Sequence, residues 1–211
     1  MRVLLLGASG GVGRRLLEQG TKRGHVIRAQ TRVLSRLADA PAGVEVVAAD
    51  PTDAAALRAL VAGQQAVVMA LGATPGRRTT LFSDVTAKLI LAMRAEGTTR
   101  LVAITGVGAG ETRGHGGLLY DNVIYPLFTR PLYADKNRQE ELVRRSALDW
   151  VLVRPAPFKS TSGMTPLQAI TEIRPTTRLT RIKREEVATF VLDELTNDRY
   201  LHKAVFIGHA S

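Results

Sequence analysis

The chain has 211 residues, 45% of them hydrophobic and 23% charged, which is the composition of an ordinary globular protein and excludes a disordered chain. The lack of cysteine excludes disulfides, thiol nucleophiles and thiolate metal sites, and it suits a reducing compartment, so we expect a cytoplasmic protein. The formal charge of +10 favours anionic partners, yet no zinc-finger spacing, aromatic-rich strand or helix-turn-helix signal indicates nucleic-acid binding, and no apolar run reaches the roughly 20 residues of a membrane helix.

Strand-like and helix-like segments alternate along the first two-thirds of the chain. Short apolar runs predict strands, and apolar residues that repeat at helical spacing predict helices. In chain order these are strand 2–6, helix 12–23, strand 26–31, an irregular stretch to Pro41, strand 44–48, a helix from the capping residue Asp53 to residue 61, strand 66–71, helix 81–96, strand 101–105, helix 136–146 and strand 150–153. This alternation predicts an α/β fold with a Rossmann-type, doubly wound parallel sheet.

The alternation weakens beyond Pro155. Residues 158–177 are rich in Ser, Thr, Gly and Pro, which predicts a loop region with one short strand near 168–173. A helix at 184–195 and a final strand at 204–207 follow. We expect a single domain, residues 1–211, in which 157–183 and 198–211 form a small C-terminal cap over the substrate.

Glycines follow the first strand directly and lead into the first helix. Gly7 permits a sharp turn, Gly10 lets the backbone approach a diphosphate, and Gly13 lets the helix pack closely on the sheet. The free N–H groups at the helix start, together with the helix dipole, hold an anion. A dinucleotide-binding turn is therefore predicted, with contacts from Gly7, Ser9, Gly10, Gly11, Val12 and Gly13.

The residues after the second strand favour NADP(H) over NAD(H). NAD-binding sheets place an acidic residue about 20 residues after the glycines, to bind the ribose 2′-hydroxyl. Here no acidic residue lies between Glu18 and Asp39; Arg32 stands at that position, and Arg36 follows one helical turn later. Two guanidinium groups suit a 2′-phosphate, although both could also be surface residues of an arginine-rich chain.

Two further predicted contacts lie at the ends of neighbouring strands. Asp50 ends the third strand, where it could reach the adenine edge or, equally, serve the turn and helix start at Pro51 and Asp53. Leu71 and Gly72 end the fourth strand, at the sheet edge where open α/β sheets bind ligands.

Several motifs together resemble a known family. The glycine spacing is G-x-x-G-x-x-G. Successive strands end with Thr31-Arg32, Ala49-Asp50, Leu71-Gly72 and Thr105-Gly106-Val107-Gly108. Two further motifs follow, Tyr133-Ala134-Asp135-Lys136 and Leu148-Asp149-Trp150-Val151-Leu152-Val153-Arg154-Pro155. This pattern resembles the atypical short-chain dehydrogenase/reductases, in particular the NAD(P)H-binding reductases related to biliverdin-IXβ reductase/flavin reductase. The resemblance covers nearly the whole chain. It implies that Asp50 approaches the adenine, that Thr105, Gly106 and Lys136 contact the cofactor, and that Pro155 to Phe158 lie under the nicotinamide.

The catalytic residues depart from the pattern of carbonyl-reducing relatives, which use a serine near the end of the fifth strand and a Tyr-x-x-x-Lys helix. Here the strand ends Thr105-Gly106, and Tyr133 and Lys136 are three residues apart rather than four. That spacing still places both on neighbouring helix positions, so a catalytic pair stays open. The alternatives are Lys136 on the nicotinamide ribose or the substrate, and Tyr133 N-terminal to the helix, as a packed aromatic residue beside Leu132.

A conjugated acceptor needs no such pair, because it takes hydride at an electron-poor ring atom and solvent supplies the proton. The leading hypothesis is therefore an NADPH-dependent oxidoreductase that reduces a flavin or similar small molecule, either anionic or aromatic. Apolar residues within 114–130 form either a lid over that pocket or a core helix. The alternatives are a carbonyl reductase or epimerase using Tyr133 and Lys136, and a non-catalytic NADP(H)-sensing regulatory protein. We expect no metal site, since the four histidines lack ligand spacing, and a monomer or weak homodimer.

Overall fold

The structure is a computed structural model, and it describes residues 1–73, 79–115, 123, 130–160 and 165–210. Most of the segment predicted as a lid or core helix, 114–130, lies outside these residues. No helix in the described ranges combines the length and the hydrophobicity needed to traverse a bilayer.

Strands and helices alternate along the first two-thirds of the chain as predicted, and β6, β7 and β8 then follow one another. The strands are β1 (Arg2–Leu6), β2 (Val26–Thr31), β3 (Glu45–Ala48), β4 (Ala66–Met69), β5 (Arg100–Ile104), β6 (Asp149–Pro155), β7 (Gln168–Ile170), β8 (Leu179–Arg181) and β9 (Lys203–Ala210). The helices are α1 (Gly11–Lys22), α2 (Ala54–Val61), α3 (Leu81–Ala95), α4 (Arg130–Arg144) and α5 (Arg184–Asp193), with short 3₁₀ turns η1 (Leu34–Leu37) and η2 (Gly110–Thr112).

The sheet is mostly parallel, in the order β3-β2-β1-β4-β5-β6-β9-β7, with β8 also paired to β9. Strand β1 lies between β2 and β4, so that Leu4 faces Arg28 on one side and Val67 on the other. The direction in which successive strands are added reverses between β1 and β4. Ligands bind at such a switch point, beyond the carboxyl ends of the strands. The predicted Rossmann-type fold is confirmed.

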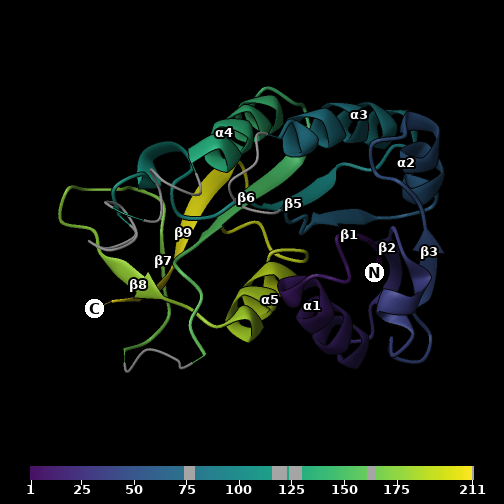
Figure 1. Cartoon of the computed structure of the whole chain (residues 1–211), viewed down its shortest axis with the longest axis horizontal. Coiled ribbons are helices and arrows are strands. Elements are labelled where there is room, and N and C mark those ends of the chain that lie inside the picture. Colours follow the sequence, from purple (N-terminus) through teal and green to yellow (C-terminus); the bar gives the residue numbers. More distant parts are fainter. Residues whose placement is uncertain (74–78, 116–122, 124–129, 161–164, 211) are drawn as a thin grey trace.

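Helices cover both faces of the sheet, with α1 and α5 on one face and α2, α3 and α4 on the other (Figure 1). Successive strand residues point to opposite faces, so Leu5 joins the core under α1 and α5 while Leu4 and Leu6 join the core under α2 and α3. All three leucines are buried. Burial on both faces explains why the central strands are continuous apolar runs.

The C-terminal third differs from the expected cap. Residues 203–210, within the segment 198–211 assigned to that cap, form β9, which extends the sheet in parallel beside β6. Val205, Phe206 and Ile207 are fully buried, because α5 covers this part of the sheet as well. Of the segment 157–183, the strands β7 and β8 run antiparallel to β9 at the end of the sheet.

Helix α4 begins at Arg130, six residues before the predicted start at 136. Pro131 is tolerated there because the first turn of a helix needs no N–H donor from that position. Tyr133 therefore lies inside the helix rather than ahead of it. The predicted cap of α2 is confirmed, since the Asp53 carboxylate accepts hydrogen bonds from the N–H groups of Ala55 (2.8 Å) and Ala56 (3.2 Å).

We expect Gly7→Ala to destabilise the protein by about 2–4 kcal/mol. Gly7 has φ +81°, and a β-carbon there would lie 2.5 Å from the carbonyl oxygen of Ala70, so both strain and a backbone collision result. The matched control is Gly63→Ala, where φ is +74° but no atom lies within 4 Å, and the backbone strain alone costs about 1–2 kcal/mol. Urea unfolding measures both. Equal losses in the two variants would contradict the close approach of the turn to β4.

Candidate functional site

Two cavities adjoin at the carboxyl ends of the parallel strands, and Gly10, Leu71 and Gly72 line both of them. The first, which we call the arginine cavity, has a volume of about 270 Å³ and is lined by Gly7, Ser9, Gly10, Gln30, Thr31, Arg32, Arg36, Asp50, Pro51, Thr52, Leu71, Gly72 and Leu81. The second, the apolar cavity, has a volume of about 490 Å³ and is lined by Gly10, Gly11, Val12, Ala70, Leu71, Gly72, Ala73, Phe82, Ile104, Thr105, Gly106, Val107, Leu132, Tyr133, Lys136, Pro155, Ala156, Pro157, Phe158 and Arg184.

Nearly every predicted site residue lines one of these cavities. The exception is Gly13, which lies beneath the turn. A β-carbon at Gly13 would collide with the carbonyl oxygens of Gly7 and Ala8, so only glycine lets α1 approach β1 this closely. The turn is closed by a hydrogen bond of 3.0 Å from the Gly10 N–H to the Gly7 carbonyl. Among the described residues no side-chain hydrogen bond caps the start of α1 at Gly10, which leaves its first N–H groups for a ligand.

Gln30 was not predicted, yet it ties the turn to the neighbouring strand. Its side chain is 2% exposed; the amide oxygen accepts from the Gly7 N–H (3.2 Å) and the amide nitrogen donates to the Ala49 carbonyl (2.7 Å). Nothing in the residue pattern marks this role, because both contacts are made across strands.

Arg32 and Arg36 both line the arginine cavity and are exposed, with η1 placing Arg36 beyond the end of β2. In the part of the chain that the structure describes, neither guanidinium has a carboxylate within 4 Å. Asp50 accepts hydrogen bonds from the Thr52 N–H (2.9 Å) and hydroxyl (2.8 Å), which lower its pKa, as does the charge of Arg32. The turn role left open for Asp50 is therefore present, and Asp50 also lines the arginine cavity.

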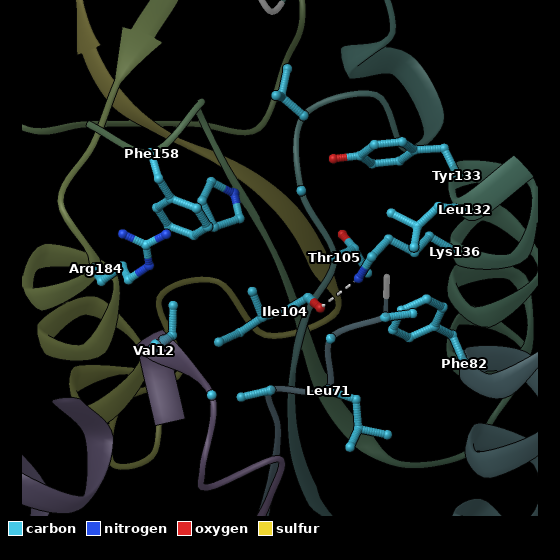
Figure 2. A pocket seen from close by; sticks show the side chains of 18 of the residues that line it. Val12, Leu71, Phe82, Ile104, Thr105, Leu132, Tyr133, Lys136, Phe158 and Arg184 are labelled. Atoms are coloured by element: carbon cyan, nitrogen blue, oxygen red, sulfur yellow. Dashed lines mark hydrogen bonds between the residues drawn. The ribbon is translucent and has the colours of Figure 1, made fainter. Parts of the chain in front are cut away.

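The apolar cavity is a slot between two walls. Figure 2 shows Leu132, Tyr133 and Lys136 on one side, from α4, and Phe158 with Arg184 on the other. The rings of Tyr133 and Phe158 thus come from opposite walls of this cavity. Phe82 and Arg184 were not predicted; Phe82 comes from the start of α3, and Arg184 is the first residue of α5.

Lys136 is 6% exposed, and its Nζ lies 4.1 Å from the centroid of the Phe82 ring. Its one hydrogen bond among the described residues is a long one of 3.4 Å to the Ile104 carbonyl. Burial lowers the pKa of Lys136 to about 8, while Glu140 and Asp135 act in the opposite direction. Below that pH the cavity wall carries a weakly compensated positive charge.

Asp135 fixes the relation between Lys136 and Phe82. It is fully buried and accepts hydrogen bonds from the Ser83 hydroxyl (2.5 Å) and the Phe82 N–H (2.8 Å) at the start of α3. A carboxylate at a helix N-terminus is favourable, so the Asp135 side chain of α4 acts as a cap for the N-terminus of α3. Phe82 is thereby held beneath the Lys136 amine.

A buried ion pair lies behind the cavity wall. Arg154, 2% exposed, donates to both carboxylate oxygens of Glu140 (3.0 and 2.5 Å) and also pairs with Glu111 (2.6 Å). The Thr105 hydroxyl donates to the same Glu140 carboxylate at 2.7 Å. Thr105 occupies the position where carbonyl-reducing relatives are expected to carry serine, and here its hydroxyl donates its hydrogen bond to Glu140. The Tyr133 hydroxyl, by contrast, lies against Gly106, where a β-carbon would be 2.8 Å from it.

A sequence model for a family described as NAD(P)H-binding matches residues 7–198. The Bacillus subtilis protein YwnB, described as uncharacterised, is 27% identical in an alignment of 178 residues, and the match covers 77% of this chain and 75% of YwnB. Among solved structures, ChuY, an anaerobillin reductase from Escherichia coli O157:H7, is 21% identical with a TM-score of 0.79 over 99% of this chain and 97% of its own. A Rossmann-fold NAD(P)-binding family protein from Shigella flexneri is 20% identical with a TM-score of 0.75 over 99% of this chain and 93% of its own. At these identities the solved structures establish the fold.

We expect Glu140→Gln to reduce the free energy of unfolding by about 3 kcal/mol or more, because it leaves the buried Arg154 charge without its main partner. The matched control is Glu141→Gln, the next residue on α4, whose exposed carboxylate pairs with Arg145 and should contribute less than about 1 kcal/mol. Replacing the whole pair, as Glu140→Leu with Arg154→Met, should cost less than Glu140→Gln alone. Urea unfolding of the three variants decides; similar values for Glu140→Gln and Glu141→Gln would contradict the buried pair.

Proposed function

Because the chain belongs to the NAD(P)H-binding family, we propose that it is an NADPH-dependent reductase that delivers hydride to a flavin or a similar conjugated small molecule. The observation that carries this proposal is the position of the apolar cavity, which adjoins the glycine turn and presents Tyr133 and Phe158 on opposite walls. The predicted cofactor, NADP(H), agrees with the family. The finer resemblance to biliverdin-IXβ reductase/flavin reductase is part of this proposal.

The residues present fit the cofactor. The turn from Gly7 to Gly13 forms a cradle that a side chain would fill, and the uncapped start of α1 offers N–H donors for a diphosphate. Arg32 and Arg36 offer two guanidinium groups for a 2′-phosphate, and Asp50 lies on the same side for the adenosine half. On this proposal the nicotinamide half enters the apolar cavity beside Pro155, Phe158 and Lys136, where NADPH supplies a hydride ion when bound.

The chain's own contribution is to bind and orient a flat acceptor and to exclude water. The slot between Tyr133 and Phe158 suits a conjugated ring. Holding the acceptor ring against the nicotinamide at a fixed distance accelerates hydride transfer through proximity. Lys136 carries a positive charge in this wall below its pKa of about 8, which favours an acidic acceptor. The fold shared with an anaerobillin reductase supports reductase chemistry on this scaffold.

A second candidate is reduction or epimerisation of a carbonyl metabolite. It is favoured by one observation: Tyr133 and Lys136 come from the same helix and line the same cavity. It is disfavoured by Thr105, because its hydroxyl already donates a hydrogen bond to Glu140.

The cofactor assignment predicts that Arg32→Glu raises the Kd for NADPH about 10- to 100-fold and changes the Kd for NADH by no more than a few-fold, since only NADPH carries the phosphate that the guanidinium would bind. Arg94→Glu, a charge reversal at an exposed position of α3 outside both cavities, is the control and should leave both Kd values unchanged. Titration calorimetry measures each. Equal weakening of NADPH and NADH by Arg32→Glu would refute the phosphate contact.

The reductase assignment predicts NADPH oxidation, followed by absorbance, with flavins or comparable conjugated acceptors and little with simple aldehydes and ketones. Tyr133→Phe should retain this activity within a few-fold, because solvent supplies the proton. Turnover confined to carbonyl compounds and abolished in Tyr133→Phe would establish the second candidate instead. Tight NADPH binding without turnover of FMN, FAD, quinones, tetrapyrroles or carbonyl compounds would indicate a sensor.

A further inference from the structure

Arg184 stands at the mouth of the apolar cavity and touches both the glycine turn and the aromatic wall. Its guanidinium carbon lies 4.7 Å from the centroid of the Phe158 ring (Figure 2). Its Nε lies where a side chain of Gly11 would begin, since a β-carbon there would be 2.7 Å away. Gly11 thus leaves the space through which Arg184 crosses the start of α1.

The positive charge of Arg184 is not neutralised by its acidic neighbours in the chain. Glu185 pairs with Arg15 at 2.7 Å, and Glu186 accepts from the Lys183 N–H (2.7 Å) and contacts His209 (3.0 Å). Across the described ranges no carboxylate lies within 4 Å of the Arg184 guanidinium. The contact with Phe158 restrains the side chain without removing its charge.

The surroundings add positive potential rather than offset it. The first turn of α1, which Arg184 crosses, contains no acidic residue, so the positive end of the helix dipole is uncompensated there. The charged side chains lining the apolar cavity are Lys136 and Arg184, both cationic. An anion that binds here is therefore attracted by two cationic side chains and by the positive end of the helix dipole.

We propose that Arg184 binds an acidic group, a phosphate or a carboxylate, of a ligand in the apolar cavity and thereby selects acidic ligands. The inference rests on the proposed function, since the ligand is either the cofactor or the acceptor. The diphosphate of the cofactor would lie on the Gly11 side of the guanidinium, and an acidic substituent of the acceptor on the Phe158 side. Both sources present the oxygen pair that a guanidinium binds through two N–H groups.

The test measures binding rather than turnover, so that it does not depend on reductase activity. Arg184→Met removes the charge and keeps an apolar stem, Arg184→Lys keeps the charge without the fork of donors, and Arg15→Met removes a nearby surface charge that already pairs with Glu185. NADPH is titrated by calorimetry. FMN and riboflavin, which share a ring system and differ in one phosphate, are titrated by flavin fluorescence in the presence of NADP⁺.

We expect Arg184→Met to weaken one binding step about tenfold, the effect of losing a charge-assisted hydrogen bond. A higher Kd for NADPH assigns the cofactor diphosphate as the bound group. A higher Kd for FMN with that of riboflavin unchanged assigns the acceptor. Arg184→Lys should lie between Arg184→Met and wild type, and Arg15→Met within about twofold of wild type.

If Arg184→Met leaves the Kd for NADPH and the ratio of FMN to riboflavin affinity unchanged, the inference is wrong, while NADPH binding by the wild type still supports the proposed function. If the wild type does not bind NADPH, the proposed function is wrong. The role of Arg184 is then decided by whether Arg184→Met weakens the binding of FMN and not that of riboflavin. Thermal unfolding of each variant confirms that the comparison is between folded proteins. Because Arg184 is exposed, the contact between its guanidinium and an acidic group of the ligand should weaken, and the Kd should rise, as ionic strength rises.

Discussion

The close approach of α1 to the ends of β1 and β4 is the constraint on which the rest of the site depends. Gly13 lies against the carbonyls of Gly7 and Ala8, and Gly7 lies against Ala70, so the turn passes through a space that admits no side chain. The uncapped N–H groups of α1 are consequently held at the switch point of the sheet, beside both cavities. Gln30 secures the turn from β2, which extends the constraint to the strand that Arg32 follows.

The site is electropositive because its carboxylates are engaged elsewhere, and not only because the chain is rich in arginine. Glu140 is held by Arg154 and Thr105, Asp135 by the start of α3, and Asp50 largely by Thr52. Each of these acids stabilises a junction between elements, and among the described residues none of them forms an ion pair within 4 Å with a cation that lines either cavity. The cations left facing the cavities are Arg32, Arg36, Lys136 and Arg184. An anionic cofactor or acceptor therefore meets little competition from the protein's own side chains.

Local patterns predicted what depends on local interactions, and long-range contacts decided the rest. The buried strands, the glycine turn and the Asp53 cap follow from apolar runs, backbone freedom and helix ends, each visible within a few residues. The three-residue strand β8 shows no periodicity and exists only because it pairs, with an irregular register, to β9. The ion pair of Glu140 with Arg154, the bridge made by Gln30 and the position of Arg184 join distant parts of the chain, and no spacing in the sequence indicates such partners.

The buried ion pair also bears on the chemistry that the cavity can support. Turning the Thr105 hydroxyl toward a substrate oxygen would deprive the buried Glu140 carboxylate of a donor at 2.7 Å, and leaving such a group short of a hydrogen bond costs about 1–3 kcal/mol. A carbonyl substrate, which needs a hydroxyl donor at that strand end, incurs this penalty in the transition state. A conjugated acceptor that takes its proton from solvent does not. The interaction that stabilises β5, β6 and α4 together thus favours the class of acceptor for which proximity and stacking suffice.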